Sequence, residues 1–214
     1  MGRENKKEAV AALHREQILK AAEALFSEKG FAQTTIEDIS GASAYSRRTI
    51  YAYYDGKEDI LHHIVEKGLL SLKREVEEAV RLPAPFLVRY EAICLAMRHY
   101  QSECPQSWQN VSKAKTAGGD SAAPSDTVRR IFELGTVINR LLADFIAQGQ
   151  ASGAVRPDVV PMMTVYVLWS SISALISLVQ TKGPFICQQF SVTEEAFYAY
   201  GFRQIIQSIL EVKR

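Results

Sequence analysis

A short stretch near the start of the chain gathers side chains that suit a nucleic acid. Residues 46–53 carry two adjacent arginines together with hydroxyl and phenol groups. An arginine can donate two hydrogen bonds to a guanine edge, whereas hydroxyl and ammonium groups suit phosphate oxygens. If this stretch is a helix with Ile50 turned inward, then Arg47, Arg48, Thr49 and Tyr51 face outward and are available to DNA. The ordinary alternative is that the arginines are merely solvated and the tyrosines cover a core.

The preceding residues must hold this stretch in place, and their pattern is helical. Over residues 17–29 the apolar positions recur at the spacing of one helical face, and Gly30 can supply a left-handed cap. Thr34 or Thr35 can then cap a second helix, with Glu37 as the other half of a capping box.

The next segments read as a helix-turn-helix followed by a longer helix. The second helix is expected to end near Gly41, and Ser46 can cap a third helix that runs to about Tyr53. Asp55 and Glu58 have capping-box spacing for a fourth helix, which runs to about residue 82. In a helix-turn-helix the second of the two short helices lies in the DNA major groove.

The remaining chain also favours helices. Breaks are expected at "LPAP", "ECP", "AGGDSAAPSD", "SGAVRPD" and "TKGPF", and no alternating strand pattern is present. The predicted fold is therefore all-α with about nine helices. Residues 1–57 are expected to form a three-helix DNA-binding domain and residues 58–214 a larger helical domain. The loop from about Thr116 to Ser125 is expected to be the most mobile segment.

Composition restricts these interpretations. The net charge is only +1, and the first 59 residues carry nine Lys and Arg against ten Asp and Glu, so a DNA footprint must be narrow. The N-terminus lacks the apolar run of a signal peptide, which predicts a cytoplasmic protein. The three cysteines form no CxxC pair and suit a reducing compartment.

A resemblance adds to this picture. The run "ILKAAEALFSEKGFAQTTIEDISGASAYSRRTIYAYYDGKEDIL" resembles the DNA-binding domain of the tetracycline-repressor (TetR) family of bacterial regulators. The similar features are "AAEALFSEKGF" in the first helix, "TTIEDIS" in the second, and "TIYAYYDGKEDI" in the recognition helix and the turn after it. The resemblance implies a mostly helical homodimer that binds double-stranded DNA through its first three helices, with a larger domain that dimerises and often binds a small ligand.

The resemblance also assigns roles to individual residues. It implies phosphate contacts for Thr35, Tyr51 and Lys57, and contacts to bases or nearby phosphates for Arg47, Arg48 and Thr49. The sequence departs from the family twice, because Ala44 replaces the usual glycine of the turn and Arg48 replaces a small residue. The predicted DNA-binding residues are Thr35, Ser46, Arg47, Arg48, Thr49, Tyr51, Tyr53 and Lys57.

The stretch "VVPMMTVYVLWSSISALISLVQT" has no charged residue, and its length nominally suits a membrane span. Its Ser and Thr residues, its proline and the absence of a close basic cluster favour a helix buried on two sides instead. In the resembling family the last two long helices form the homodimer interface, and this stretch and the final helix fall in those places. An ordinary core helix is the alternative.

In the resembling family the helices of the larger domain surround an inducer cavity, which predicts a hydrophobic small-molecule effector. The predicted pocket residues are Met97, Tyr100, Trp108, Phe145, Tyr166 and Trp169, although each is also typical of an ordinary core. A helical enzyme that uses this cavity is the alternative function, but no nucleophile elbow, phosphate loop or paired carboxylates support it. A thiol sensor based on Cys94 and Cys104 is a third hypothesis. We expect no cofactor and no metal site, because His62 and His63 lack i, i+4 spacing.

Overall fold

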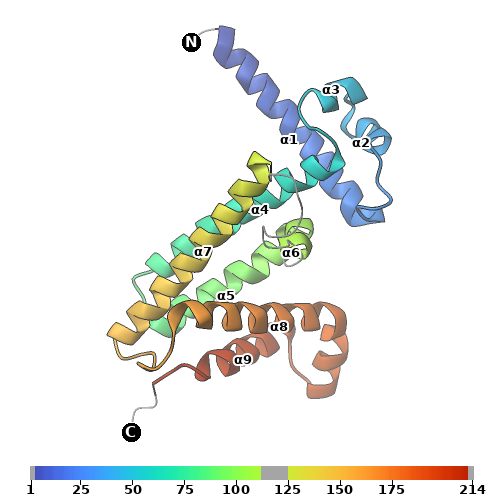
Figure 1. The fold of residues 1–214 in the computed structure, drawn as a ribbon. Helices are drawn as coiled ribbons and strands as arrows, with labels where there is room; N and C mark the ends of the chain where they lie inside the picture. The colour runs from blue at the N-terminus through green and yellow to red at the C-terminus, as the bar shows by residue number, and fades with distance from the viewer. Residues whose placement is uncertain (1–2, 112–124, 212–214) are drawn as a thin grey trace, which may run out of the picture. The chain divides into compact units, whose positions relative to one another are not determined.

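The computed structural model describes residues 3–111 and 125–211, and these residues form nine helices and no strand, as the sequence predicts (Figure 1). An isolated bridge pairs Val155 with Leu210. Most of the loop predicted to be mobile lies outside the described residues. The helices are α1 (Arg3–Lys29), α2 (Ile36–Ser43), α3 (Arg47–Tyr51), α4 (Lys57–Arg81), α5 (Phe86–Glu103), α6 (Pro105–Val111), α7 (Asp126–Ala151), α8 (Pro161–Phe190) and α9 (Glu194–Gln207).

The chain divides into two compact units. The first comprises residues 1–70 and 103–133, and the second comprises residues 71–102 and 134–214. Helices α4 and α7 each contribute residues to both units. The division of function between residues 1–57 and 58–214 is a separate matter and stays a prediction.

In the first unit, α1 supplies the core on which the short helices pack. Ile18 and Ala22 are fully buried, and the ring of Phe26 meets the ring of Phe31 at 5.1 Å between centroids. Gly30 has φ +84°, so it ends α1 with the left-handed conformation that glycine adopts without a steric penalty. The predicted left-handed cap at Gly30 is confirmed.

Of the two residues predicted to cap α2, Thr35 is the N-cap and Thr34 is not. Thr35 is the N-cap, and its hydroxyl accepts a hydrogen bond from the Asp38 N–H at 3.2 Å. The third helical position is therefore Asp38, whose carboxylate completes the capping box, and the assignment of that role to Glu37 was wrong. Thr34 is buried instead, and its hydroxyl donates to the Gly30 carbonyl at 2.9 Å.

The recognition helix α3 is shorter than predicted. Ser46 caps it as expected, and its hydroxyl accepts from the Thr49 N–H at 3.1 Å. The helix ends at Tyr51, after which a turn leads to α4. The predicted pairing of Asp55 with Glu58 was wrong by one residue, because the Asp55 N–H donates to Asp59 at 3.1 Å.

In the second unit, α8 continues where a break was predicted. It runs through the "TKGPF" segment to Phe190 with Pro184 inside the helix, and Figure 1 shows the bend in its last turns. Proline removes one helical hydrogen bond and crowds the preceding turn, which explains a bend rather than an end. Packing against α9 retains the helix, because Gly183 is buried and a Cβ there would lie 2.6 Å from a Glu194 carboxylate oxygen.

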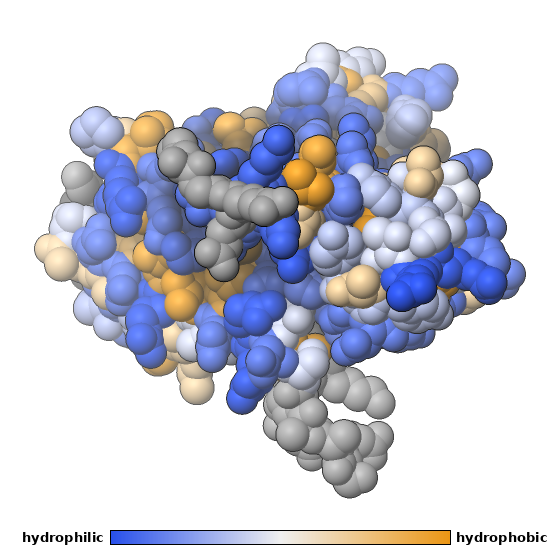
Figure 2. Space-filling model, turned by 90° about the horizontal axis from the view of Figure 1, so that it is seen from above, coloured by the Kyte–Doolittle hydropathy of each residue, from blue (hydrophilic) through white to orange (hydrophobic). Residues whose placement is uncertain are grey.

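Several large hydrophobic side chains of α8 and α9 are exposed to solvent. Large hydrophobic side chains more than 60% exposed are Met163, Tyr166, Val167, Phe185, Phe190 and Tyr200. Among the described helices, α8 alone is long and apolar enough to cross a membrane by length and composition. Figure 2 shows another view of the surface, on which hydrophilic side chains surround separate hydrophobic patches.

Candidate nucleic-acid interface

Three tyrosines fasten α3 and its flanking turns to α1. The Tyr54 hydroxyl donates to the Arg15 carbonyl at 3.2 Å, and burial raises the pKa of Tyr54 to about 12. The Tyr53 hydroxyl lies 3.2 Å from His14 Nδ1, and the Tyr45 hydroxyl donates to Gln17. These phenols therefore position the recognition helix. The predicted DNA contact of Tyr53 has to compete with its place against α1.

The two faces of α3 have opposite environments. Ile50 points inward and is fully buried, as is Ile39 on α2. Tyr51 is 56% exposed, and both Arg47 and Arg48 are exposed. The outward face expected from the sequence is thus present, with its two guanidinium groups accessible to a ligand.

The hydroxyl groups of this region serve its helix caps. Ser46 Oγ lies 2.9 Å from Thr49 Oγ1, so the two predicted contacts bond to each other. The Thr35 hydroxyl donates to Asp38 Oδ2 at 2.7 Å, and its N–H donates to the same oxygen at 2.8 Å. A phosphate contact by Thr35 therefore has to share or replace its hydrogen bond to Asp38.

Asp38 is held as a carboxylate by several donors. Its carboxylate lies 2.6 Å from the ammonium of Lys29 and also accepts the two Thr35 hydrogen bonds. The Lys29 hydrogen bond is the largest cause that holds the pKa of Asp38 well below its usual range, followed by the hydrogen bonds from Thr35. Lys29 is thereby neutralised close to the N-terminus of α2.

Lys57 has a structural role in this conformation. Its ammonium donates to the carbonyls of Phe31, Ala32 and Thr34 at 3.0, 3.3 and 3.0 Å, and it lies 4.6 Å from the centroid of the Phe31 ring. An ammonium has three N–H donors, so these carbonyls use them all. Lys57 thus closes the loop before α2, and the phosphate contact implied by the resemblance would require it to leave that loop.

The two arginines of α3 differ in their partners. Arg47 donates to the Glu37 carboxylate on α2, and both side chains are more than 60% exposed. In the described part of the chain no carboxylate forms an ion pair with Arg48. Of the basic residues predicted to bind DNA, Arg47 and Lys57 already have partners within the protein, whereas Arg48 has no ion pair among the described residues.

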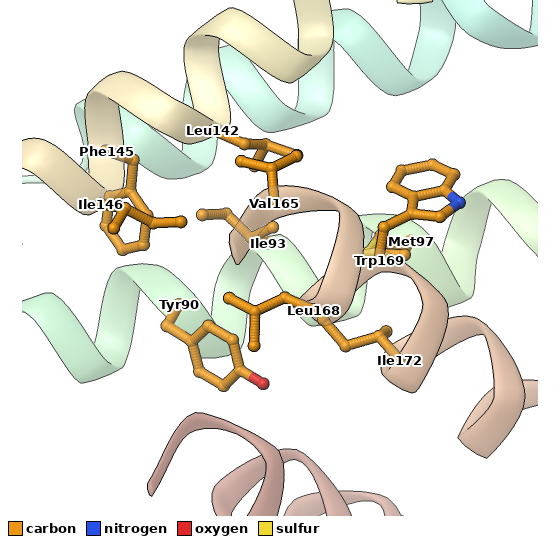
Figure 3. A pocket seen from close by; sticks show the side chains of 10 residues that line it. All are labelled: Tyr90, Ile93, Met97, Leu142, Phe145, Ile146, Val165, Leu168, Trp169 and Ile172. Atoms are coloured by element: carbon orange, nitrogen blue, oxygen red, sulfur yellow. The ribbon is translucent and has the colours of Figure 1, made fainter. Parts of the chain in front are cut away.

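The second unit contains a small apolar cavity, shown in Figure 3. It encloses about 30 Å³, and three of the predicted pocket residues line it, namely Met97, Phe145 and Trp169. Tyr100 is buried outside the lining, Tyr166 is 61% exposed on α8, and Trp108 belongs to α6 in the first unit. The lining residues that the sequence analysis missed are Tyr90, Ile93, Leu142, Ile146, Val165, Leu168 and Ile172.

The missed residues are mostly aliphatic. The sequence marks them only as apolar positions on a helical face, which does not distinguish a cavity lining from an ordinary core. Tyr90 carries the one hydroxyl group of the lining and donates it to the Phe202 carbonyl at 3.0 Å. The lining thus offers no paired acid and base for the alternative enzymatic function. Within the described residues no cluster of His, Cys, Asp and Glu could hold a metal ion.

The environment of Cys94 does not favour the thiol-sensor hypothesis. Cys94 is fully buried, and burial raises the pKa of its thiol to about 12. A thiol reacts with oxidants as the thiolate, which is scarce for such a group at neutral pH.

Comparison with known proteins agrees with this geometry. Residues 18–64 match the family described as "Bacterial regulatory proteins, tetR family". The chain is 30% identical to the HTH-type transcriptional repressor BepR of Brucella suis over 44% of this chain and 46% of that one. It is 28% identical to the HTH-type transcriptional repressor NicS of Pseudomonas putida over 68% and 67% of the two chains. The chain thus spans less than half the length of some curated relatives that it matches.

A solved structure extends the agreement in fold to both units. The transcriptional regulator FadR of Bacillus subtilis, solved with stearoyl-CoA, superposes with a TM-score of 0.67 at 15% identity, covering 89% of this chain and 97% of that one. Residues 18–64, which match the family, contain α2 with its cap, the turn at Ala44 and the recognition helix α3. Residues 18–64 therefore match the tetR family of bacterial regulatory proteins, and the described chain has a fold similar to that of a solved regulator.

Proposed function

We propose that this protein is a transcriptional regulator, most simply a repressor, that binds double-stranded DNA with α3 in the major groove. The observation that carries the proposal is the exposed α3 face, where no carboxylate of the described residues pairs with Arg48 and Ile50 is buried on the opposite side. The relatives BepR and NicS are HTH-type transcriptional repressors, which supports repression. DNA binding in turn implies a cytoplasmic protein.

The proposed working form is a homodimer joined through α8 and α9. One subunit leaves the apolar face of these helices in water, and a second copy can bury it by a two-fold operation. Two recognition helices then meet two half-sites of a palindromic operator about one DNA turn, roughly 34–36 Å, apart. Burial by a second subunit also accounts for the apolar character of α8 without a membrane.

The proposed effector is a hydrophobic small molecule that enters the cavity of the second unit. The cavity of about 30 Å³ is far below the roughly 300–1,000 Å³ of ordinary ligand sites, so an effector must select or create a more open state. FadR of Bacillus subtilis was solved with stearoyl-CoA, which supports an acyl or similarly apolar ligand for the fold. The effector would change DNA affinity only as far as it prefers the open state.

A mobility-shift titration tests the DNA-binding part of this proposal. The probe is the DNA that flanks the protein's own gene, titrated at low and at physiological salt concentration. The proposal expects a discrete complex that unlabelled random-sequence DNA displaces poorly. Equal competition by specific and random DNA at both salt concentrations would refute a sequence-specific regulator.

A further inference from the structure

The ion pair between Glu37 and Arg47 lies on the surface assigned to DNA. It joins the first turn of α2 to the first turn of α3, across the turn of the helix-turn-helix motif. The Glu37 side chain is 62% exposed and that of Arg47 is 63% exposed. The carboxylate is thus accessible on a surface that the proposed function directs toward a polyanion.

Glu37 is one of two acidic residues in the first turn of α2, where a negative charge suits the helix dipole. Asp38, not Glu37, completes the capping box of α2 and pairs with Lys29. An ion pair this exposed stabilises the folded state little, because water and salt screen it. We therefore look for the role of this ion pair in DNA binding, not in the stability of the fold.

The chemistry of the pair indicates what Glu37 does to Arg47. The guanidinium donates to Glu37 through Nη1, which leaves its other N–H groups free to meet an acceptor. A guanidinium fixed in direction can reach a base edge in one register, whereas an unrestrained arginine can follow phosphate oxygens at any sequence. The carboxylate also cancels the charge that would attract Arg47 to phosphates and repels them itself.

We propose that Glu37 is a specificity-determining residue that positions Arg47 for a base edge and keeps it from non-specific phosphate contacts. This inference rests on the proposed DNA-binding function and deepens it. The two arginines of α3 then differ, because no carboxylate of the described residues restrains Arg48, whereas Arg47 acts only where the DNA sequence offers an acceptor in register.

The test compares the variant Glu37→Gln with wild type on two duplexes. One duplex is the site that wild type enriches from a random pool, and the other is a scrambled duplex of equal length and composition. We expect the variant to bind the scrambled duplex roughly 3- to 10-fold more tightly, with a salt slope steeper by about 0.9, because one more phosphate contact forms. Operator affinity should rise less, so the ratio of specific to non-specific affinity falls.

The matched control is Glu28→Gln, which makes the same charge change at an exposed carboxylate of α1. No ion pair joins Glu28 to a cation within the described residues. In an Arg47→Ala background, Glu37→Gln should have no larger effect than Glu28→Gln. Equal effects of Glu37→Gln with and without Arg47 would overturn the inference, since they would show a general charge effect.

The outcomes also separate this inference from the proposed function. If wild type itself fails to distinguish the two duplexes, the proposed function fails. If wild type distinguishes them and Glu37→Gln behaves like Glu28→Gln, DNA binding stands and the role of Glu37 is refuted.

Discussion

At the scale of single residues, the surface proposed to bind DNA contains both paired and unpaired basic side chains. Lys29 and Arg47 are paired with carboxylates, and the Lys57 ammonium donates to three carbonyls. Arg48 stands where the family usually has a small residue, and it has no such partner among the described residues. Because the N-terminal segment as a whole is not basic, this one side chain should contribute a large share of the recognition.

Arg48→Ala should therefore weaken operator binding by about 1–3 kcal/mol, or roughly 5- to 150-fold, and relax the preference at one base pair of each half-site. A titration against operators substituted at each position measures both effects. Arg48→Lys retains the positive charge but not the bidentate guanidinium donor. Compared with Arg48→Ala, it should bind all sequences more tightly but should regain little of the base preference. A uniform loss across sequences with Arg48→Ala would mean that Arg48 contacts only phosphate.

Asp38 provides a prediction for pH. Because its folded-state pKa lies below the ordinary value of 3.8, the folded state gains stability from the carboxylate above about pH 4. That gain is lost as the pH falls below 3.8 toward the folded-state value. Asp38→Asn should thus melt at a lower temperature than wild type at pH 7, and the difference should shrink at pH 3. Melting curves of both proteins at the two pH values check this, and a constant difference would contradict it.

At the scale of elements, the helices follow from the sequence but their ends depend on packing. Periodicity and caps predicted nine helices, the Gly30 cap and the start of α3 at Ser46. Thr35 was one of the two predicted caps of α2, but the carboxylate partners Glu37 and Glu58 were each misplaced by one residue. Neighbouring acidic residues have the same chemistry, and only the backbone conformation selects one. The break at "TKGPF" failed for a different reason, since contact with α9 carries α8 past Pro184.

The site was predictable to the same degree. The outward face of α3 follows from helical geometry once Ile50 is buried. The pairing of Arg47 with Glu37 and the capture of Lys57 by the loop before α2 join residues 10 and 23 to 26 positions apart. No local pattern predicts such contacts, because they form only when α3 packs beside α2 and the start of α4 packs against the loop before α2.

The turn between α2 and α3 yields a prediction at this scale. Ala44 has φ 59°, a left-handed conformation that is costly for a residue with a Cβ. Ala44→Gly should raise the free energy of unfolding by about 0.5–1 kcal/mol, after allowing for the larger entropy of the unfolded chain. The control Ala42→Gly lies inside α2, where glycine should lower stability by about 0.5–1 kcal/mol. Urea denaturation of the two variants should give opposite signs, and equal signs would refute the argument.

At the scale of the whole molecule, the exposed apolar face of α8 and α9 calls for a partner. The proposed partner is a second copy, because a two-fold dimer would supply a matching apolar surface and present two recognition helices together. A single α3 with one free arginine offers few contacts, so the second subunit supplies much of the affinity.

Val167→Glu tests the dimer directly, because Val167 is 62% exposed on α8. The buried charge should turn the dimer into a monomer and weaken operator binding by about 100-fold or more, since the linkage of two binding units is lost. Val137→Glu is the matched control on α7, where Val137 is 40% exposed. Sedimentation should find only the first variant monomeric. A Val167→Glu dimer, or a monomeric wild type, would exclude this interface.

The most direct test of DNA recognition is selection of bound sequences from a random duplex pool by the wild-type protein at low salt concentration. We expect two inverted half-sites whose centres lie about 10 base pairs apart, one for each α3 of the dimer. A pool that remains as diverse after several rounds as at the start would contradict the assignment of this surface to sequence-specific DNA binding.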